Sequence, residues 1–294
     1  MVSWPEPGTR VTVRYRRPAG SIPPLTDAVG HLLAVDPVVR VRTKTGAVVE
    51  FAPADAVALR VLTDAPLRTS QIRALEHAAA AAWPGVERAW LDGWLLRAAP
   101  GVGLAANSAV PLDISARLTT VPAIVAWYER RGLTPWLAIP DRLLRLPPGV
   151  TSQHIERVLV RDVSSGGEPD PSIILSTRPD DGWLRLSRGE VPIDTLTSVI
   201  DGELMFGTHP DVAVARAALT DAPDGTRWVG LSAIAAPDEQ GAAGICGTLL
   251  SWGAGRGATR GYLLADDTGA RGLADSLGFR LHHRRRYVRA IDTV

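Results

Sequence analysis

The chain has 294 residues, of which 46% are hydrophobic and 21% are charged, and its formal net charge is +1. This composition is typical of a globular protein and excludes a disordered or fibrous chain. A charge so close to neutral also excludes a general attraction to nucleic acid or to an anionic membrane, so any partner must be recognised locally.

Length and missing segment types set further limits. At about 150 residues per domain, the length suggests two domains. No apolar run approaches the roughly 20 residues of a membrane helix, and the first ten residues lack the apolar core of a signal peptide. We therefore expect a cytoplasmic protein with no membrane partner. The single cysteine, Cys246, has no partner for an internal disulfide, and no Cys/His spacing indicates a metal site.

Residues 1–64 are predicted to form a small accessory β-domain. Apolar and polar residues alternate in four short segments, at residues 11–16, 31–35, 38–43 and 48–51. Gly46 lies between two of these segments and can adopt the positive φ that a hairpin turn requires. Residues 53–55 fit a short helical turn ahead of a last strand. Taken together, the pattern resembles an SH3-like barrel.

Arginines occupy alternating positions on two of these strands, so Arg14 shares a face with Arg16, and Arg40 shares one with Arg42. These arginines could form a basic surface that binds nucleic acid or an acidic partner. Alternatively, they are the ordinary solvated faces of antiparallel strands. Tyr15 alone supplies an interleaved aromatic ring, whereas nucleic-acid platforms stack bases on several. The solvated faces are favoured, and nucleic acid is not expected as a partner.

Residues 66–146 are predicted to form a second unit. A helix is predicted at residues 69–85, followed by a hairpin whose strands are residues 92–101 and 104–112. A second helix at 118–133 and a strand at 134–139 complete the unit. The stretch GVGLAA at 101–106 matches the G-x-G-x-x-A dinucleotide-binding pattern. Because it joins two strands and no helix opens after it, a turn is the better interpretation.

Residues 150–294 alternate strands and helices. Strands are predicted at 154–163, 173–179, 228–236, 258–267 and 280–291, and helices at 192–200, after 244, and at 268–279. Residues 203–210 are interpreted as a loop. On the last strand, His282 and His283 are adjacent, so their side chains are expected on opposite faces of a solvated edge, which argues against a metal pair.

A strand, a glycine-containing loop and a helix follow one another around residue 240. The strand at 228–236 ends at a turn with Asp238 and Glu239. The loop that follows consists of Gly241, Ala242, Ala243 and Gly244. Small side chains let backbone N–H groups approach a ligand closely, and a helix N-terminus adds about half an elementary positive charge. This order therefore suits an anionic ligand.

The same stretch resembles motif A of the GNAT acetyltransferase superfamily, in which a Gln/Arg-x-x-Gly-x-Gly/Ala turn holds the pyrophosphate of acetyl-CoA. Its six positions correspond here to Gly241, Ala242, Ala243, Gly244, Ile245 and Cys246, with Gln240 next to the first. Residues 83–112 and 127–139 also resemble pieces of a GNAT unit, without a glycine loop. The resemblance implies a mixed α+β GNAT acyl-CoA N-acyltransferase fold, tandem-like, with a degenerate half at 66–146 and a working half at 150–294.

By the same resemblance, the chain is expected to be an acetyl-CoA-dependent N-acetyltransferase with acetyl-CoA as co-substrate and no metal. The acceptor is expected to be a small-molecule or peptide amine, and a homodimer is compatible with the fold. The residues implied to contact acetyl-CoA are Ala233, Ile234 and Ala235 along the pantetheine arm, Gln240, Gly241, Ala242, Ala243, Gly244 and Ile245 at the pyrophosphate, and Asp267 near the arm.

The side chains that would catalyse the transfer follow the family less closely. Ala274 stands where the family often has a tyrosine acid, and Tyr262 and Tyr287 are the nearby alternatives. The strand at 228–236 contains no carboxylate, so Glu203 is the candidate general base. Asp238 with Glu239, or His209, could serve instead.

Two other functions stay open from the sequence. The missing tyrosine and the unmatched base position are compatible with a catalytically weak or inactive CoA-binding regulatory protein on a GNAT scaffold. The N-terminal β-domain is compatible with an adaptor for nucleic acid or protein. The acetyltransferase is favoured because a phosphate-binding stretch is retained.

Overall fold

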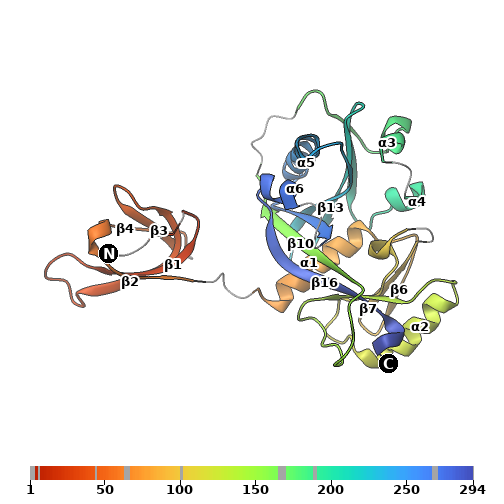
Figure 1. Ribbon diagram of the computed structural model, residues 1–294, viewed down its shortest axis with the longest axis horizontal. Helices are drawn as coiled ribbons and strands as arrows, with labels where there is room; N and C mark the ends of the chain where they lie inside the picture. The colour runs from red at the N-terminus through yellow and green to blue at the C-terminus, as the bar shows by residue number, and fades with distance from the viewer. Residues whose placement is uncertain are drawn as a thin grey trace. The chain divides into compact units, whose positions relative to one another are not determined.

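A computed structural model describes residues 4–5, 7–43, 45–62, 67–99, 102–164, 170–187, 191–266 and 271–293. The chain divides into two compact units, residues 1–67 and residues 68–294 (Figure 1). Among the described residues, no helix combines the length and the apolar character needed to cross a bilayer.

The N-terminal unit is a five-stranded antiparallel sheet with the strand order β4-β3-β2-β1-β5. Its elements are β1 (Arg10–Arg16), β2 (Leu25–Ala34), β3 (Val39–Thr43), β4 (Val48–Phe51), the 3₁₀ helix η1 (Pro53–Asp55) and β5 (Ala56–Val61). Alternating residues such as Val11, Val13, Val39 and Val41 are fully buried and form its core. The predicted small β-domain, with a short helical turn before its last strand, is confirmed.

The arginines of this unit are solvated. Arg14 pairs with Asp27 at 2.9 Å and Arg40 pairs with Glu50 at 2.7 Å, and all four side chains are exposed. Such exposed pairs between neighbouring strands are worth about 1 kcal/mol or less each. The solvated strand faces favoured from the sequence are therefore present.

The C-terminal unit contains an eight-stranded sheet with the order β11-β12-β13-β14-β15-β10-β16-β9. Its strands are β9 (Trp136–Pro140), β10 (His154–Asp162), β11 (Ile174–Ser176), β12 (Glu203–His209), β13 (Ala213–Asp221), β14 (Arg227–Ala235), β15 (Arg260–Asp266) and β16 (Arg280–Arg289). A second sheet consists of β6 (Glu87–Leu91), β7 (Trp94–Ala98) and β8 (Val110–Pro111). The helices are α1 (Thr69–Ala82), α2 (Val121–Glu129), α3 (Asp181–Leu186), α4 (Ile193–Leu196), α5 (Glu239–Ala254) and α6 (Arg271–Ser276).

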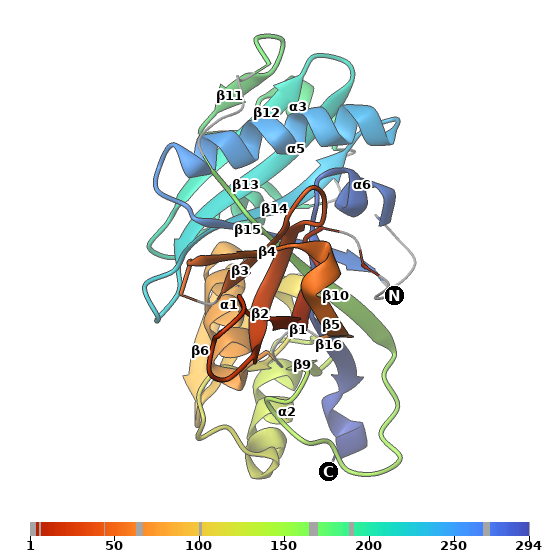
Figure 2. The ribbon, with the colours of Figure 1, turned by 90° about the vertical axis from the view of Figure 1, so that its left-hand side faces the viewer.

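Helices cover both faces of the large sheet. The strands β14 and β15 are parallel and are joined by α5, whereas the other described strand pairs of this sheet are antiparallel. Helix α5 lies across β12, β13 and β14 (Figure 2) and buries Ile245 and Leu249 against them. Helix α1 packs on the opposite face, with Leu75 against Val158 and Tyr262. We call these two sides the α5 face and the α1 face.

The two predicted halves of this unit share one sheet. β9, from the predicted first half, pairs with β16 near the C-terminus, and β10 lies between β15 and β16. The predicted link at residues 147–149 therefore lies inside one compact unit.

Two strands differ from the sequence predictions. Residues 203–209, expected as a loop, form β12, and β13 was not predicted at all. The sequence of β13 is AVARAALTD, and all of its residues except the last are buried. A strand covered on both faces has no alternation of apolar and polar residues, so the period-two signal is missing. The predicted helix at 192–200 is limited to the four residues of α4.

The predicted hairpin at residues 92–112 has a different turn. β6 and β7 are joined by Asp92 and Gly93, whose φ values of 43° and 85° belong to a two-residue hairpin turn. Residues 92–101, predicted as the first strand of the hairpin, therefore begin with the turn between β6 and β7. Residues 104–106 form a 3₁₀ helix instead of a strand, and Gly101 lies outside the described residues.

We expect Gly93→Ala to destabilise the protein more than Gly225→Ala does. Both glycines have a positive φ, 85° and 82°, where an added Cβ costs roughly 1–2 kcal/mol. At Gly93 the Cβ would also lie 2.5 Å from Ser115 Oγ and 2.7 Å from Ala116 N, whereas nothing lies within 4 Å at Gly225. Denaturant unfolding should show a loss of about 2–4 kcal/mol for Gly93→Ala and about 1 kcal/mol for Gly225→Ala. Equal losses would contradict a tightly packed turn.

Candidate functional site

Strand β14 carries a β-bulge near its end. Its pairing with β13 shifts so that two residues, Ala233 and Ile234, oppose the single residue Ala215. Ala233 has a φ of 48°, a left-handed conformation that costs a non-glycine residue about 1–2 kcal/mol. Such strain persists only where the surrounding structure fixes it, and a bulge leaves backbone groups outside the strand ladder. The bulge thus provides backbone polar groups at one defined point of the sheet.

β14 and β15 separate just before this bulge. Their parallel pairing ends at Leu231 with Leu263, although β14 continues to Ala235 and β15 continues to Asp266. The backbone groups that face the resulting gap have no partner on the neighbouring strand. The sheet therefore opens between its two parallel strands.

Two cavities meet at the bulge. The first, which we call the gap cavity, has a volume of about 440 Å³ and is lined by both separated strands together with Trp83 and Glu156. The second, the helix-side cavity, has a volume of about 660 Å³ and is lined by the end of β14 and by residues of α3 and α4. Ala233 and Ile234 line both cavities. The bulge can therefore be reached from two directions.

Helix α5 begins earlier than the sequence predicts. Asp238 is its N-cap and accepts a hydrogen bond from the Gly241 N–H at 2.8 Å. Gly241, Ala242, Ala243 and Gly244, predicted as a loop, therefore lie inside the helix. A strong cap followed by alanines favours helix over loop. The free N–H groups of the first turn still make this end of α5 suitable for an anion.

The α5 residues identified from the family motif offer mainly their backbone. Ala242 and Ile245 are buried against the sheet, so their side chains are not available to a ligand. Gln240 and Gly244 are exposed, and no atom lies within 4 Å of the position that a Gly244 Cβ would occupy. Asp267, also predicted to contact the cofactor, lies outside the described residues.

Glu203 lies away from both cavities. It is the first residue of β12, it is exposed, and its carboxylate accepts a hydrogen bond from Arg256 Nε at 3.1 Å. Arg256 follows the C-terminal end of α5, whereas the bulge adjoins the N-terminal end of that helix. The structure therefore does not bring the predicted general base together with Ala233, Ile234 and Ala235.

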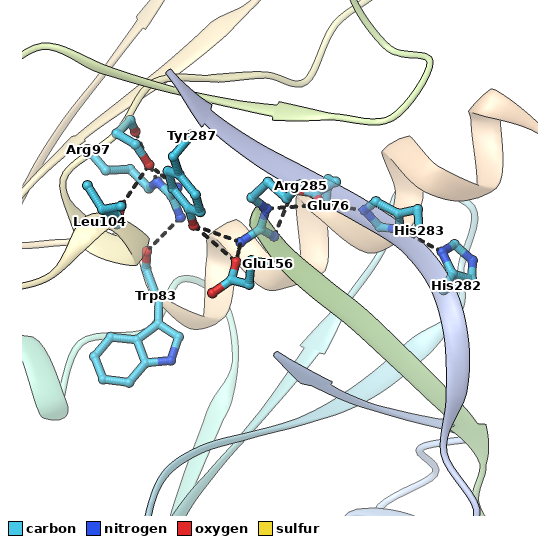
Figure 3. A network of polar contacts seen from close by, with 10 residues as sticks. Glu76, Trp83, Arg97, Leu104, Glu156, His282, His283, Arg285 and Tyr287 are labelled. Atoms are coloured by element: carbon cyan, nitrogen blue, oxygen red, sulfur yellow. Dashed lines mark hydrogen bonds and ion pairs between the residues drawn. The ribbon is translucent and has the colours of Figure 1, made fainter. Parts of the chain in front are cut away.

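A buried ionic cluster extends from α1 to the gap cavity, with Arg285 between two carboxylates (Figure 3). Arg285 donates from Nη2 to Glu76 Oε2 at 2.9 Å and from Nη1 to Glu156 Oε2 at 2.8 Å. His283 Nε2 donates to Glu76 Oε1 at 2.6 Å, and the Tyr287 hydroxyl donates to Glu156 Oε2 at 3.1 Å. Because Glu156 lines the gap cavity, the cluster ends there.

The charges of this cluster stabilise one another. Burial acts to raise the pKa of Glu76, but the charge of Arg285 and the hydrogen bond from His283 outweigh it and hold the pKa at about 2. Burial likewise acts to lower the pKa of Arg285, but Glu76 and Glu156 keep that pKa well above its usual value. Glu76 and Arg285 are therefore both ionised at neutral pH, although water does not reach them.

The adjacent histidines do not point to opposite faces. Val158 pairs with His283 and Leu159 pairs with Leu281, so His282 is the extra residue of a bulge in β16. The bulge brings His282 Nδ1 within 2.8 Å of His283 Nδ1. β16 is moreover an internal strand, so the predicted solvated edge is wrong. The described residues contain no group of three or more His, Cys, Asp or Glu side chains that could hold a metal ion.

Glu156 was missed from the sequence, although a signal for it exists. In the strand segment HIERVLVRDV, Glu156 shares its face with Val158 and Val160, which are both buried. A carboxylate in register with buried residues must be paired or must face a cavity. Glu156 does both, because it pairs with Arg285 and lines the gap cavity, and its side chain is only 13% exposed.

Comparison with known proteins agrees with this geometry. The family model described as "Probable histone acetyltransferase Rv0428c C-terminal" matches residues 69–288, and the model described as "Rv0428c N-terminal Sm-like domain" matches residues 5–60. The chain is 69% identical over 295 residues to "Probable histone acetyltransferase Rv0428c" of Mycobacterium tuberculosis, a match that covers 99% of this chain and 97% of that protein.

A solved structure supports the fold. A GCN5-related N-acetyltransferase from Kribbella flavida is similar with a TM-score of 0.50 at 13% sequence identity, over 76% of this chain and 96% of that one. An identity this low supports the fold alone. The predicted GNAT fold is confirmed, and the N-terminal unit predicted as SH3-like is similar to an Sm-like domain.

We expect Glu76→Gln to destabilise the protein far more than Glu203→Gln does. Each glutamate pairs with an arginine, but Glu76 is buried with Arg285 whereas the Glu203 side chain is 52% exposed. Loss of the buried partner leaves Arg285 with a reduced counter-charge, which should lower the free energy of unfolding by about 3–5 kcal/mol. Loss of the exposed pair should cost about 1 kcal/mol or less. Denaturant titration of both variants measures the difference.

The pH dependence of unfolding supplies the control for Glu76. Its folded pKa of about 2 lies below the usual 4.5, so its contribution is complete above pH 4.5 and is lost as the pH falls toward 2. This part of the acid slope should be absent in Glu76→Gln and present in Glu203→Gln. An unchanged acid slope in Glu76→Gln would contradict the pairing.

Proposed function

The chain belongs to the family of the probable histone acetyltransferase Rv0428c and is a GNAT-type acetyltransferase, and on that premise we propose that it transfers the acetyl group of acetyl-CoA to a primary amine. The observation that carries the proposal is the bulge of β14 at the point where β14 and β15 separate. A transfer of this kind requires a held thioester, an unprotonated amine, and stabilisation of the oxyanion and of the departing thiolate.

The bulge suits the thioester end of acetyl-CoA. The pantetheine arm carries two amides, which pair with free backbone groups as a neighbouring strand would. An N–H group at the bulge can donate to the thioester carbonyl and stabilise the oxyanion that forms from it. We therefore assign Ala233, Ile234 and Ala235 to the arm and the thioester. The apolar residues of the gap cavity, such as Leu231 and Leu263, suit the methylene groups of the arm.

The N-terminal end of α5 suits the pyrophosphate. Its free N–H groups and its dipole favour an anion, and the exposed Gly244 leaves room for one. The residues assigned to the pyrophosphate by the family motif are Gln240, Gly241, Ala242, Ala243, Gly244 and Ile245. Of these, Gln240 and Gly241 lie in the first turn, where N–H groups have no intrahelical carbonyl partner. Asp267 is assigned to the arm because it directly follows β15. The Asp238 carboxylate already accepts from one of these N–H groups, so the pyrophosphate must compete with it.

Glu156 takes the place of Glu203 as the proposed general base. It is the carboxylate that lines the gap cavity among the described residues. Arg285 and Tyr287 both donate to its Oε2, which leaves Oε1 to accept a proton. In the reaction the amine nitrogen forms the C–N bond at the thioester carbon, the N–H proton passes to Glu156, and the C–S bond breaks with its electron pair on sulfur.

We propose a lysine side chain of a protein as the acceptor. The relative that is 69% identical is named a probable histone acetyltransferase, and histones present their amines on lysine side chains. Glu156 lines the gap cavity, and a carboxylate attracts the ammonium form of lysine. The helix-side cavity is lined by both Asp211 and Arg185, so their charges balance, and Glu156 is the carboxylate proposed to attract the amine.

We expect Gly244→Glu to weaken acetyl-CoA binding without destabilising the protein. Gly244 lies at the N-terminal end of α5 with open space around it, so the substitution removes a helix glycine and should stabilise folding by up to about 1 kcal/mol. The added carboxylate repels the pyrophosphate and fills its space, which should raise Kd at least about tenfold in calorimetry.

Gly247→Glu is the matched control for this charge. Gly247 also has open space around it, and it lies about one turn further along the same helix. Its Kd for acetyl-CoA should stay within about threefold of the wild-type value. Equal weakening by both substitutions would contradict a pyrophosphate site at the helix N-terminus.

We expect Glu156→Gln to lower kcat by about 100-fold or more while the Kd for acetyl-CoA changes less than about threefold. Thiol release measured with lysine-containing peptides gives kcat, and calorimetry gives Kd. Glu203→Gln, which removes the exposed carboxylate paired with Arg256, should keep the wild-type kcat. Equal loss in the two variants would contradict the assignment of the base.

Calorimetry and the thiol-release assay together separate the acetyltransferase from a CoA-binding regulatory protein. No binding of acetyl-CoA at millimolar concentration would contradict the proposed function. Binding without turnover over a panel of peptide and small-molecule amines would instead support a CoA-binding regulatory protein.

A further inference from the structure

A buried arginine lies next to the bulge of β14. Arg216 of β13 pairs with Ser232, the residue that precedes the bulge, and its side chain is fully buried. The guanidinium donates from Nε to Leu196 O at 2.7 Å, and from Nη2 to Ala82 O and Ser198 O at 2.9 Å each. Arg216 thus ties α1, α4 and β13 together close to the gap cavity.

Among the described residues, Arg216 has no counter-ion. In the part of the chain that the structure describes, no Asp or Glu lies within ion-pair distance of its guanidinium, which is bonded to carbonyls and a hydroxyl. Burial lowers the pKa of Arg216 to about 10, so the side chain is a cation at neutral pH. Carbonyl dipoles stabilise this cation, as does the Trp83 ring, whose centroid lies 4.3 Å from Arg216 Cζ. Arg285, by contrast, holds two carboxylates.

Ser232 connects this charge to the gap cavity. Arg216 Nη1 donates to Ser232 Oγ at 3.3 Å, and Ser232 lines the cavity. The Ser232 hydroxyl itself faces Arg216 O at 3.5 Å, the outer limit of a hydrogen bond, so it can turn toward a stronger acceptor in the cavity. A hydroxyl that accepts a hydrogen bond from a cation is also a better donor.

The transfer needs such a donor. The CoA sulfur leaves with negative charge, and Ala274, which stands at the position of the family's tyrosine acid, is a buried side chain without a polar atom. None of the tyrosines in the described ranges lines the gap cavity. Among the described residues, the polar side-chain groups that line it are the Ser232 hydroxyl, the Glu156 carboxyl and the Trp83 indole N–H. Glu156 already serves as the proposed base, and the Trp83 ring packs against Arg216, so Ser232 is the proposed donor.

We infer that Ser232 is a catalytic residue whose hydroxyl donates a hydrogen bond to the departing CoA thiolate, and that Arg216 is a positioning residue that strengthens this donor. The inference rests on the proposed function. When the tetrahedral intermediate collapses, the C–S bond breaks, its electron pair stays on sulfur, and the amine proton is already on Glu156. Ser232 keeps its own proton, because a serine hydroxyl is much less acidic than a thiol. It lowers the energy of the thiolate by hydrogen bonding alone.

The test is the acidity of the thiol of coenzyme A bound to the intact protein, measured by ultraviolet titration of the thiolate. In the wild-type complex the acid dissociation constant of the thiol should be about tenfold larger than in free coenzyme A, which corresponds to about 1.4 kcal/mol. In Ser232→Ala it should return to within about threefold of the free value. The same variant should lower kcat by about tenfold or more, with the Kd for acetyl-CoA changed less than about threefold.

Ser198→Ala is the matched control. The Ser198 hydroxyl donates to Gly85 O at 3.0 Å, while the Ser198 backbone carbonyl, which the substitution keeps, accepts from Arg216. This variant should therefore keep the thiol acidity of the wild-type complex. Glu156 acts to lower the acidity of the thiol equally in the wild type and in both variants, so its effect cancels when the proteins are compared with one another.

The outcomes separate the two proposals. Coenzyme A that binds with the same thiol acidity in wild type and Ser232→Ala overturns the roles of Ser232 and Arg216 and leaves the proposed function standing. No binding of coenzyme A to the wild-type protein at millimolar concentration overturns both.

Discussion

Arg285 holds two carboxylates, the buried Glu76 of α1 and Glu156 of β10, whose side chain is 13% exposed and lines the gap cavity. None of these ions is stable alone, because an unpaired buried charge loses several kcal/mol of hydration. Arg285 is 209 residues from Glu76 and 129 residues from Glu156 in the chain, so the cluster ties α1 to two strands of the sheet. The position of α1 is thereby coupled to the carboxylate that faces the gap cavity.

The large sheet separates apolar packing from buried charge. On the α5 face, Leu231 and Leu249 belong to one continuous apolar cluster. On the α1 face, Glu76 of α1 accepts from Arg285 of β16, and Arg216 of β13 donates to Ala82 O of α1, so two buried charges lie on this side. The gap between β14 and β15 is the place where the two environments meet. An acyl arm needs the first environment and proton transfer needs the second, so the separation of two strands supplies both to one reaction.

The range of the interactions decides which of these features the sequence can predict. Local signals, such as strand alternation, identify the order of elements from β14 to β16 and most of the N-terminal unit. β13 gives no such signal because it is buried on both faces. The bulge at Ala233 and the pairing of Arg216 with Ser232 depend on strand register, which composition does not encode. Glu203 is the base candidate that the sequence suggests, but the fold pairs it with Arg256, which follows the C-terminal end of α5, away from the bulge.

The departures from the family motif fall on side chains, whereas the proposed site depends on backbone groups and buried charge. Gly241 stands where the motif has Gln or Arg, but the contact proposed there uses an N–H group, which glycine also has. Ala274 removes a tyrosine hydroxyl, but Ser232 next to the uncompensated charge of Arg216 can meet the same chemical need. Backbone conformation and buried charge are fixed by packing across the sheet and not by the identity of one loop residue. A substitution that relaxed the φ of Ala233, or that gave Arg216 a carboxylate partner, would therefore impair this site even with every motif residue of α5 in place.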